Sequence, residues 1–247
     1  MVVMKEIKTL LIIQARTSSS RLPGKVLMPV NGKPILEWQT RRVLQTASID
    51  QVVMATSVES SDDEVELIAN RCGIPAVRGS LKNVFSRFTK AVDIFGSKIV
   101  IRITGDCPLY MPKLCEIMLD EFKRSSVDYL SNTLAPTDPD GCDIEIFSAS
   151  ALKSLESMQL TSSELEHVTQ GLYQRNKDFN CKNFSNKVDE SAHRWTLDTS
   201  DDLKFIRKIY EKFIGSETIF EYEDVVSFLR ENPGLARYND GTKRNSG

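Results

Sequence analysis

The chain has 247 residues, of which 40% are hydrophobic and 27% charged, and its formal net charge is −2 at pH 7. This composition is ordinary for a globular protein, and the slightly acidic balance excludes a general nucleic-acid binder, which would carry a basic excess. We expect no signal peptide, since no small-residue cleavage site accompanies the short apolar run within 1–14, and no segment long enough to span a bilayer. Five widely spaced cysteines without a C-x-x-C pair indicate reduced thiols and a cytoplasmic protein.

Strand-like and helix-like segments alternate along the first half of the chain. Apolar runs rich in Val and Ile predict strands, and runs with apolar residues three and four apart predict helices. We expect strands at 8–14, 51–56, 74–77, 98–103 and 127–131, and helices at 34–46, 61–72, 84–95 and 112–124. Strands that alternate with such helices indicate βαβ units. The sequence therefore predicts a three-layer α/β fold, in which a mostly parallel sheet carries helices on both faces.

The pattern changes after residue 132, although no linker or repeat interrupts the chain. A turn-rich stretch at 133–141 leads into a less regular second half. There we expect strands at 143–147, 181–185 and 193–197, and helices at 149–157, 161–175, 200–213 and 222–231. We treat 1–237 as a single domain and expect the polar residues 238–247 to form a flexible tail.

The stretch QARTSSSRLPGK, residues 14–25, follows the first predicted strand directly and gathers charge and hydrogen-bond donors. Ligands of a parallel sheet bind outside the carboxyl ends of its strands, which is where this stretch lies. Arg16, Arg21 and Lys25 supply the positive charge and the intervening hydroxyl residues supply donors, as a phosphate-binding loop requires. The stretch matches neither the P-loop nor the G-x-G-x-x-G motif. An ordinary solvated surface loop is the alternative.

Two aspartates follow predicted strands on other parts of the chain. Asp106 lies on a glycine turn just past the strand at 98–103, and Asp198 follows the strand at 193–197 and precedes a helix. Carboxylates that converge from separate strand ends can hold Mg²⁺, which takes one or two carboxylates together with phosphate oxygens and water. The alternative is that each aspartate caps the segment after it. We favour the metal site, because the cationic loop is expected at the same edge.

Candidate acceptor-binding residues lie in the second half of the chain. Asp143 and Glu145 are two apart and would point to one face of a strand, where they could bind sugar hydroxyls, an amine or a second metal, or simply face water. Neither of the two histidines, His167 and His193, has a partner at metal-ligand spacing, which argues against zinc. Arg194 beside His193 could bind an anion, since guanidinium pairs with carboxylate through two hydrogen bonds. For His167 a structural role is equally open.

The order of these motifs resembles that of the cytidylyltransferases that activate acidic sugars, the CMP-Kdo and CMP-sialic acid synthetases. The resemblance is closer still to the spore-coat polysaccharide biosynthesis protein F branch, whose loop reads Q-A-R-x-G-S-x-R-L-P-G-K, with Ser18 here in place of the first glycine. Further blocks follow in the family's order: NGKP at 31–34, RGS at 78–80, RITGDCPL at 102–109, YLSNT at 129–133, DGCDIEIF at 140–147, EHVT at 166–169 and HRWTLDT at 193–199.

The resemblance implies a Rossmann-like fold of the nucleotide-diphospho-sugar transferase type. Residues 1–132 would form the nucleotide half, and 133–237 the part for the acceptor and for dimerisation. It implies a Mg²⁺-dependent homodimer that transfers CMP from CTP to an acidic sugar or related anionic acceptor and releases pyrophosphate. Such an enzyme would serve surface polysaccharide or glycoconjugate biosynthesis.

The resemblance also carries roles over to individual residues. Asp106 and Asp198 would hold the metal, and the catalytic residues would be Lys25, Arg16, Arg21 and Asp106. Nucleotide binding would fall to Gln14, Ala15, Arg16, Ser19, Arg21, Lys25, Thr104 and Gly105, with Arg78 and Ser80 at the cytosine base. Acceptor binding would fall to Asn132, Asp143, Glu145, His167 and Arg194.

Two other classes of protein remain open. A nucleotide-sugar-dependent glycosyltransferase has a similar nucleotide half but usually carries D-x-D at the strand end, where this chain reads T-G-D at 104–106. A non-catalytic nucleotide- or sugar-binding homologue is made more credible by Ser18. Release of pyrophosphate from CTP would separate the cytidylyltransferase from both.

Overall fold

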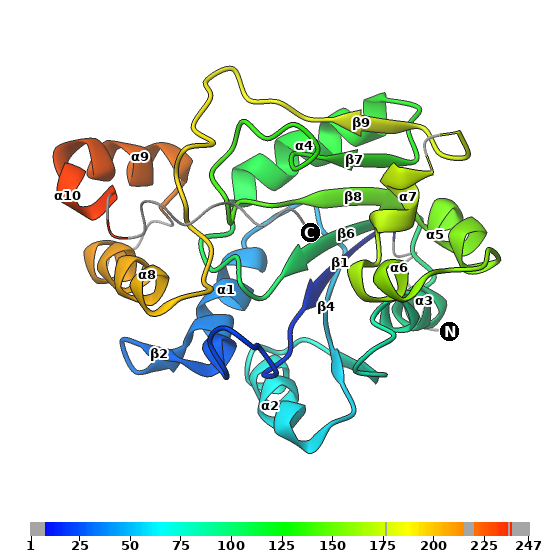
Figure 1. The fold of residues 1–247 in the computed structure, drawn as a ribbon, viewed down its shortest axis with the longest axis horizontal. Helices are drawn as coiled ribbons and strands as arrows, with labels where there is room; N and C mark the ends of the chain where they lie inside the picture. Colours follow the sequence, from blue (N-terminus) through cyan, green and yellow to red (C-terminus); the bar gives the residue numbers. More distant parts are fainter. Residues whose placement is uncertain (1–7, 176, 215–219, 237, 239–247) are drawn as a thin grey trace, which may run out of the picture.

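The computed structural model describes residues 8–175, 177–214, 220–236 and 238 (Figure 1). Its central sheet has the strand order β5-β4-β1-β6-β8-β7-β9. The strands are β1 (Thr9–Gln14), β4 (Gln51–Ser57), β5 (Ala76–Gly79), β6 (Ile99–Thr104), β7 (Tyr129–Ser131), β8 (Glu145–Ser148) and β9 (Cys181–Asn183). Neighbouring strands are parallel except that β8 runs antiparallel to β6 and β7, so the mostly parallel sheet is confirmed.

Helices cover both faces of this sheet, which confirms the three-layer prediction (Figure 1). One hydrophobic cluster lies between the sheet and a set of helices: α1 (Ile35–Val43), α2 (Asp63–Arg71), α4 (Pro112–Arg124), α8 (Ser200–Phe213) and α9 (Tyr222–Glu231). The second cluster lies on the other face, against α3 (Phe85–Phe95), α5 (Ala149–Glu156), α6 (Ser162–His167) and α7 (Gln170–Gln174). The four middle residues of strand β1 are all apolar because Leu11 and Ile13 face the first cluster while Leu10 and Ile12 face the second.

The register of the central strands brings the predicted motifs together. Strands β1 and β6 are paired in parallel, with Gln14 opposite Thr104. The Gly105 backbone nitrogen continues this pairing by donating to the Gln14 carbonyl oxygen at 2.8 Å. The loop after β1 and the T-G-D turn after β6 therefore begin side by side at the carboxyl edge, as the sequence predicts.

Several local elements differ from the sequence prediction. A short hairpin of β2 (Pro29–Val30) and β3 (Lys33–Pro34) precedes α1, and a short helix, α10 (Pro233–Ala236), follows α9. The helix expected at 161–175 is two helices, because Val168 adopts a positive φ of 47° that no α-helix contains. The strand expected at 193–197 is an extended segment joined to its neighbour by one isolated bridge, Asp140 to Arg194.

No helix in the described part of the chain is long and apolar enough to cross a membrane. The expected tail at 238–247 lies, apart from Tyr238, outside the described residues.

The extended segment 193–198 is held by backbone hydrogen bonds between two loops. The Trp195 nitrogen donates to the Asp140 carbonyl at 2.6 Å, and the Leu197 nitrogen donates to the Asp106 carbonyl at 2.9 Å. Gly141 permits the first contact: its φ is +107°, and a Cβ atom there would lie 2.5 Å from the Trp195 carbonyl carbon. This packing places the end of the segment beside the turn after β6.

We predict that Gly141→Ala lowers the free energy of unfolding by about 3 kcal/mol. The Cβ atom would collide with the backbone of 195–196, and alanine would be strained at this positive φ. Gly32→Ala is the matched control, since its φ is +77° but its Cβ atom would meet nothing within 4 Å. That substitution should cost only about 1 kcal/mol. Urea unfolding of both variants measures the difference, and equal losses would contradict the close approach.

Candidate active site

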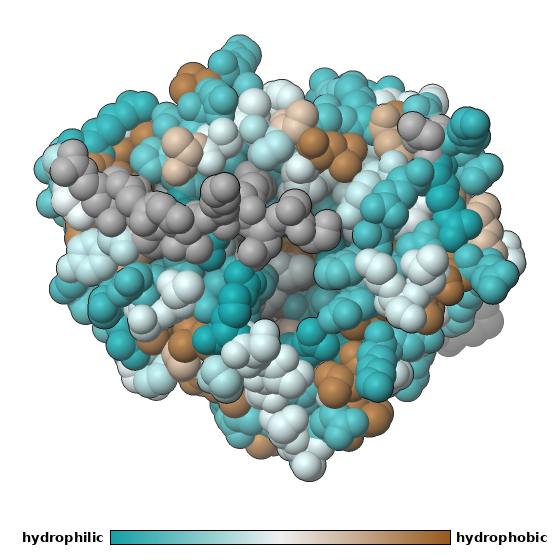
Figure 2. Space-filling view, in the orientation of Figure 1, coloured by the Kyte–Doolittle hydropathy of each residue, from teal (hydrophilic) through white to brown (hydrophobic). Residues whose placement is uncertain are grey.

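A cavity of about 400 Å³ lies at the carboxyl edge of β1 and β6. Figure 2 shows hydrophilic residues around a hollow near the middle of this face. Most residues predicted for the nucleotide line the cavity, together with one predicted for the acceptor: Gln14, Ala15, Arg16, Ser19, Arg21, Lys25, Thr104, Gly105, Asp106 and His167. The loop at 14–25, the T-G-D turn and the end of α6 therefore form one site.

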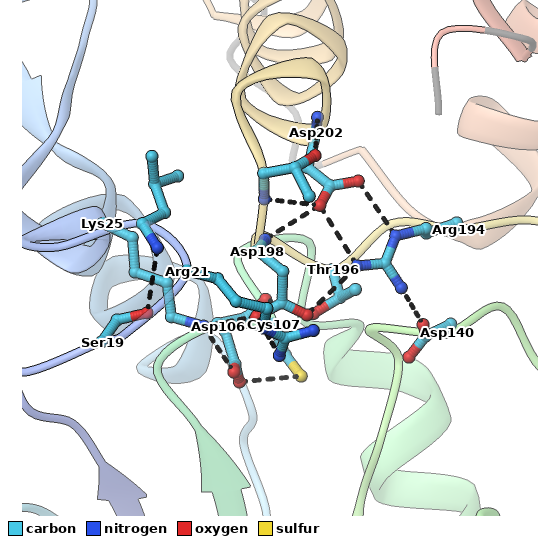
Figure 3. A network of polar contacts seen from close by, with 12 residues as sticks. Ser19, Arg21, Lys25, Asp106, Cys107, Asp140, Arg194, Thr196, Asp198 and Asp202 are labelled. Carbon is cyan, nitrogen blue, oxygen red and sulfur yellow. Dashed lines mark hydrogen bonds and ion pairs between the residues drawn. The ribbon is translucent and has the colours of Figure 1, made fainter. Parts of the chain in front are cut away.

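Lys25 is the centre of this site (Figure 3). Its Nζ atom lies 2.8 Å from Asp106 Oδ2 and 2.8 Å from Asp198 Oδ1, and only 8% of the residue is exposed. Arg21 Nη2 lies 2.9 Å from the same Asp198 oxygen. Gly24, with a φ of +70°, makes the left-handed turn that directs Lys25 inward. The structure thus brings the predicted metal aspartates together around a cation supplied by the loop.

The charges at this centre stabilise one another. Burial alone would lower the pKa of Lys25, but its ion pairs and hydrogen bonds with Asp106 and Asp198 raise it overall. Burial alone would raise the pKa of Asp106, but Lys25 and the hydrogen bond donated by Thr104 Oγ1 at 2.6 Å lower it overall. The ammonium group and the Asp106 carboxylate therefore stay charged at neutral pH.

Arg194 lies behind Asp198 and holds its other carboxylate oxygen (Figure 3). Arg194 is 7% exposed, and its guanidinium group contacts Asp198 Oδ2 at 3.1 Å, Asp140 Oδ2 at 2.6 Å and Asp202 Oδ1 at 3.0 Å. It does not line the cavity, so the structure does not bring Arg194 together with the other predicted site residues there. Its three buried carboxylate partners explain why it points inward: Arg194 fixes Asp198 with Oδ1 turned toward Lys25.

Asp198 is not the residue that caps the helix after it, which was the alternative to a metal site. The N-cap of α8 is Thr199, whose side chain accepts from the Asp202 nitrogen at 3.2 Å. Asp202 in turn accepts from the backbone nitrogens of Asp198 and Thr199, each at 2.9 Å. Since this capping box satisfies the helix start, the Asp198 carboxylate is left to face the cations.

Asp62, which the sequence did not single out, anchors the cationic loop. It is 1% exposed in the short 3₁₀ turn at Ser60–Asp62, and its Oδ1 accepts from the Thr17 nitrogen at 2.8 Å and Thr17 Oγ1 at 2.7 Å. Its Oδ2 accepts from Ser57 Oγ at 2.5 Å. Thr17 holds the loop closed, because its carbonyl accepts from the nitrogens of Ser19 and Gly24. Asp62 thus connects the end of β4 to the loop after β1.

The comparisons with known proteins agree with this geometry. Residues 10–227 match the cytidylyltransferase family. The chain belongs to this family. It is 32% identical, over 92% of its length and 96% of the relative's, to the spore coat polysaccharide biosynthesis protein SpsF of Bacillus subtilis strain 168.

Solved structures also resemble this cytidylyltransferase. A cytidylyltransferase from Leptospira borgpetersenii serovar Hardjo-bovis superposes with a TM-score of 0.89 at 31% identity, covering 96% of this chain and 99% of that one. A CMP:2-keto-3-deoxy-manno-octonic acid synthetase complexed with CTP superposes with a TM-score of 0.66 at 20% identity, covering 83% and 99% of the two chains. The second likeness confirms the Rossmann-like fold, and this protein is a nucleotidyltransferase.

Arg78 and Ser80, predicted at the base, do not line the cavity of this cytidylyltransferase. Arg78 Nη1 pairs with Asp63 Oδ1 and with Glu66 Oε2, each at 2.8 Å, on the neighbouring helix α2. Ser80 Oγ accepts from the Asn83 nitrogen at 3.0 Å and so helps begin the turn into α3. Acidic residues of α2 draw the Arg78 side chain outward, and the sequence pattern did not reveal this.

Three predicted acceptor residues also lie outside the cavity. Asn132 is fully buried, where Nδ2 donates to Asp138 Oδ2 and the Cys142 carbonyl while Oδ1 accepts from the Ile144 nitrogen, all at 2.9 Å. Asn132 thus anchors the loop that contains Asp138 and Cys142, outside the cavity. Asp143 precedes β8, so it does not share a strand face with Glu145. The buried Glu145 carboxylate accepts from other side chains and lies behind the cavity wall.

We predict that Asp62→Asn destabilises the protein in a pH-dependent way. Burial alone would raise the pKa of Asp62, but hydrogen bonds from Ser57 and Thr17 lower it below its usual value near 3.8. A lowered folded-state pKa contributes stability that is present above the unfolded-state pKa and lost as the pH falls through the folded-state value. The variant should lose about 1–2 kcal/mol at pH 7.

The loss should begin to shrink as the pH falls below the unfolded-state pKa, near 3.8, and should vanish only below the lower folded-state pKa, where the wild-type carboxylate itself becomes protonated. Urea unfolding of both proteins at pH 7 and 5, and at a series of pH values from about 4 down to about 2, measures the loss. A difference that does not change over this range would show that the Asp62 charge plays no part in holding the loop.

Proposed function

We propose that this cytidylyltransferase transfers CMP from CTP to an acidic sugar or a related anionic acceptor, with Mg²⁺, and releases pyrophosphate for surface polysaccharide or glycoconjugate biosynthesis. The observation that carries the proposal is the convergence of Arg21 and Lys25 with two carboxylates at the cavity: Asp106 lines it, and Asp198 lies just outside its lining, in contact with both cations. The likeness to a synthetase complexed with CTP supports the choice of nucleotide. Its substrate, a keto sugar acid, supports the choice of acceptor.

Asp106 and Asp198 suit a divalent cation. One oxygen of each lies 2.8 Å from the same point, the Lys25 ammonium nitrogen, so the two carboxylates already converge on a shared cation. Mg²⁺ is commonly held by one or two carboxylates together with substrate phosphates, and these two residues would hold it here. When bound, it would neutralise charge that develops on the phosphates.

The loop at 14–25 would bind the triphosphate of CTP. Arg16 and Arg21 line the cavity with 38% and 47% of their side chains accessible, and we expect both to contact the triphosphate in place of their present partners, Glu166 and Asp198. An acceptor oxygen then forms its bond to the α-phosphorus while the bond to the bridging oxygen breaks. Pyrophosphate leaves, and the hydroxyl proton passes to solvent. Positioning and charge stabilisation by Arg16, Arg21 and Lys25 account for this chemistry without a covalent intermediate.

Cys107, which lies next to Asp106, is not suited to be a nucleophile. It is 4% exposed, and burial together with the neighbouring Asp106 charge raises the pKa of its thiol well above its usual value. The protonated thiol is a poor nucleophile at neutral pH. Direct displacement by the acceptor is therefore the simpler route.

The proposal is tested by a screen for pyrophosphate release. The protein is incubated with Mg²⁺ and each of the four nucleoside triphosphates, in turn with 3-deoxy-manno-octulosonate, N-acetylneuraminate and an alkyl phosphonate. We expect release with CTP and at least one acid. Binding of CTP without release for any acceptor would favour a non-catalytic homologue, and transfer from a nucleotide sugar would favour a glycosyltransferase. We also propose that the enzyme acts in the cytoplasm and forms a homodimer.

We predict that Lys25→Ala lowers kcat and kcat/KM together by about a hundredfold, because an electrostatic contact that strengthens in the transition state is lost.

Asp106→Asn should abolish turnover while the melting temperature stays within a few degrees. Lys33→Ala is the matched control, since Lys33 pairs with Glu37 outside the cavity. Unchanged CTP turnover in both Lys25→Ala and Arg21→Ala would show that the loop does not bind the triphosphate.

A further inference from the structure

We propose that Arg102 binds the carboxylate of the acceptor and thereby selects acids over neutral sugars. The proposal rests on the function proposed above and names the residue that sets its acceptor class. Arg102 lines the same cavity as the cationic loop, but it belongs to the middle of the sheet and not to the loop.

The register of the sheet fixes where Arg102 points. It lies on β6 opposite Ile12 of β1 and opposite Glu145 of the antiparallel strand β8. Because side chains alternate along a strand, Arg102 and Thr104 point to the same face, and both line the cavity. His167, at the end of α6, lines the cavity as well. Arg102 therefore forms part of the cavity wall on the side of β6.

The guanidinium group is held rigidly in this wall. Its Nη1 atom pairs with Glu145 Oε2, and its Nε atom donates to Gln14 Oε1 at 3.0 Å. Glu145 is itself fixed, because Oε1 accepts from Tyr129 OH at 2.7 Å and from Thr169 Oγ1 at 2.5 Å. Arginine has five N–H groups, and Arg102 Nη2 donates to no group in the described part of the chain. Donors thus remain for a ligand.

Stability alone does not explain why Arg102 and Glu145 form a buried ion pair. Only 12% of the Arg102 side chain and 10% of the Glu145 side chain are accessible. Replacing such a pair by apolar residues of similar volume often leaves the stability of a protein unchanged or raises it, because the cost of removing both charges from water offsets their attraction. The pair therefore adds little to the stability of the fold. A prepositioned guanidinium at a cavity wall does have a clear use, since its planar edge matches a carboxylate.

The acceptor supplies the carboxylate that fits this position. In the function proposed above, the negative charge of the triphosphate is balanced by Arg16, Arg21 and Lys25, which all come from the loop after β1. Arg102 is therefore left for a different anion. In a keto sugar acid the carboxylate is attached to the carbon that bears the reacting anomeric hydroxyl. A carboxylate fixed by Arg102 would therefore also fix the attacking oxygen relative to the phosphates, which is how orientation accelerates transfer.

The test uses a paired substitution, Arg102→Gln with Glu145→Gln, so that no unpaired charge is left buried; Arg102→Lys is the second variant. Tyr129→Phe is the matched control, because it removes another donor to Glu145 from a residue outside the cavity. Pyrophosphate release is measured with 3-deoxy-manno-octulosonate and N-acetylneuraminate and with their methyl esters. The KM for acceptor and for CTP are determined separately.

We expect both Arg102 variants to raise the KM for the acid at least about thirtyfold and to leave the KM for CTP within about twofold. Activity on the methyl ester should not fall, and Tyr129→Phe should keep the wild-type preference for the acid. An unchanged ratio of acid to ester would overturn the proposal. A KM for CTP that rises as much as that for the acid would overturn it too, by assigning Arg102 to the nucleotide.

Calorimetric titration of the acids into the wild-type and variant proteins separates this proposal from the function it rests on. If wild type releases no pyrophosphate from CTP with any acceptor, the cytidylyltransferase reaction fails. The Arg102 site stands in that case if wild type binds the acids and the variants do not. Equal binding by all proteins, or no binding by wild type, would reject the site.

Discussion

The active site depends on one buried contact, the Lys25 ammonium group between Asp106 and Asp198. It joins three segments that are distant in the sequence: the loop after β1, the turn after β6 and the start of α8. Without Lys25, two carboxylates in a low-dielectric setting would repel each other and separate. The cation therefore keeps both oxygens directed at one point, which is the arrangement that a metal–nucleotide complex requires.

The surrounding packing maintains this contact. Arg194 balances the acidic residues behind Asp198, and Asp62 ties down the loop that carries Lys25. The cluster contains three cations and four carboxylates: Arg21, Lys25 and Arg194 with Asp106, Asp140, Asp198 and Asp202. Such a prearranged cluster can exchange its internal cation contacts for contacts with Mg²⁺ and phosphate at little reorganisation cost.

Sequence reasoning reached the parts of this site that are set by local pattern. Continuous apolar runs identified β1 and β6, and the segments that follow parallel strands lie at the carboxyl edge, so the loop with Lys25 and the turn with Asp106 could be placed there. Asp198 was placed there from a strand expected at 193–197, which the structure shows as an extended segment with one isolated bridge. The splitting of α6 from α7 was missed because a positive φ at a valine has no sequence signature.

The residues that lie outside the cavity against expectation share a different physical cause, which is competition among side chains from distant segments. Arg78 was expected at the base, but acids on α2 hold it. Arg194 was expected at the acceptor, but buried aspartates hold it behind the site. Conversely, Arg102 and Asp62 read as ordinary strand and helix-start residues, and only the register of β6 with β8 and the fold of the loop reveal their positions.

A crystal structure with CTP and Mn²⁺ in place of Mg²⁺ tests the central contact most directly. Mn²⁺ gives an anomalous signal that locates the ion without reference to activity. We expect the ion between the Asp106 and Asp198 carboxylates, with the Lys25 ammonium group moved onto the phosphates of CTP in the cavity. A structure in which Lys25 still bridges the two aspartates, with the ion or the triphosphate bound elsewhere, would contradict the assignment.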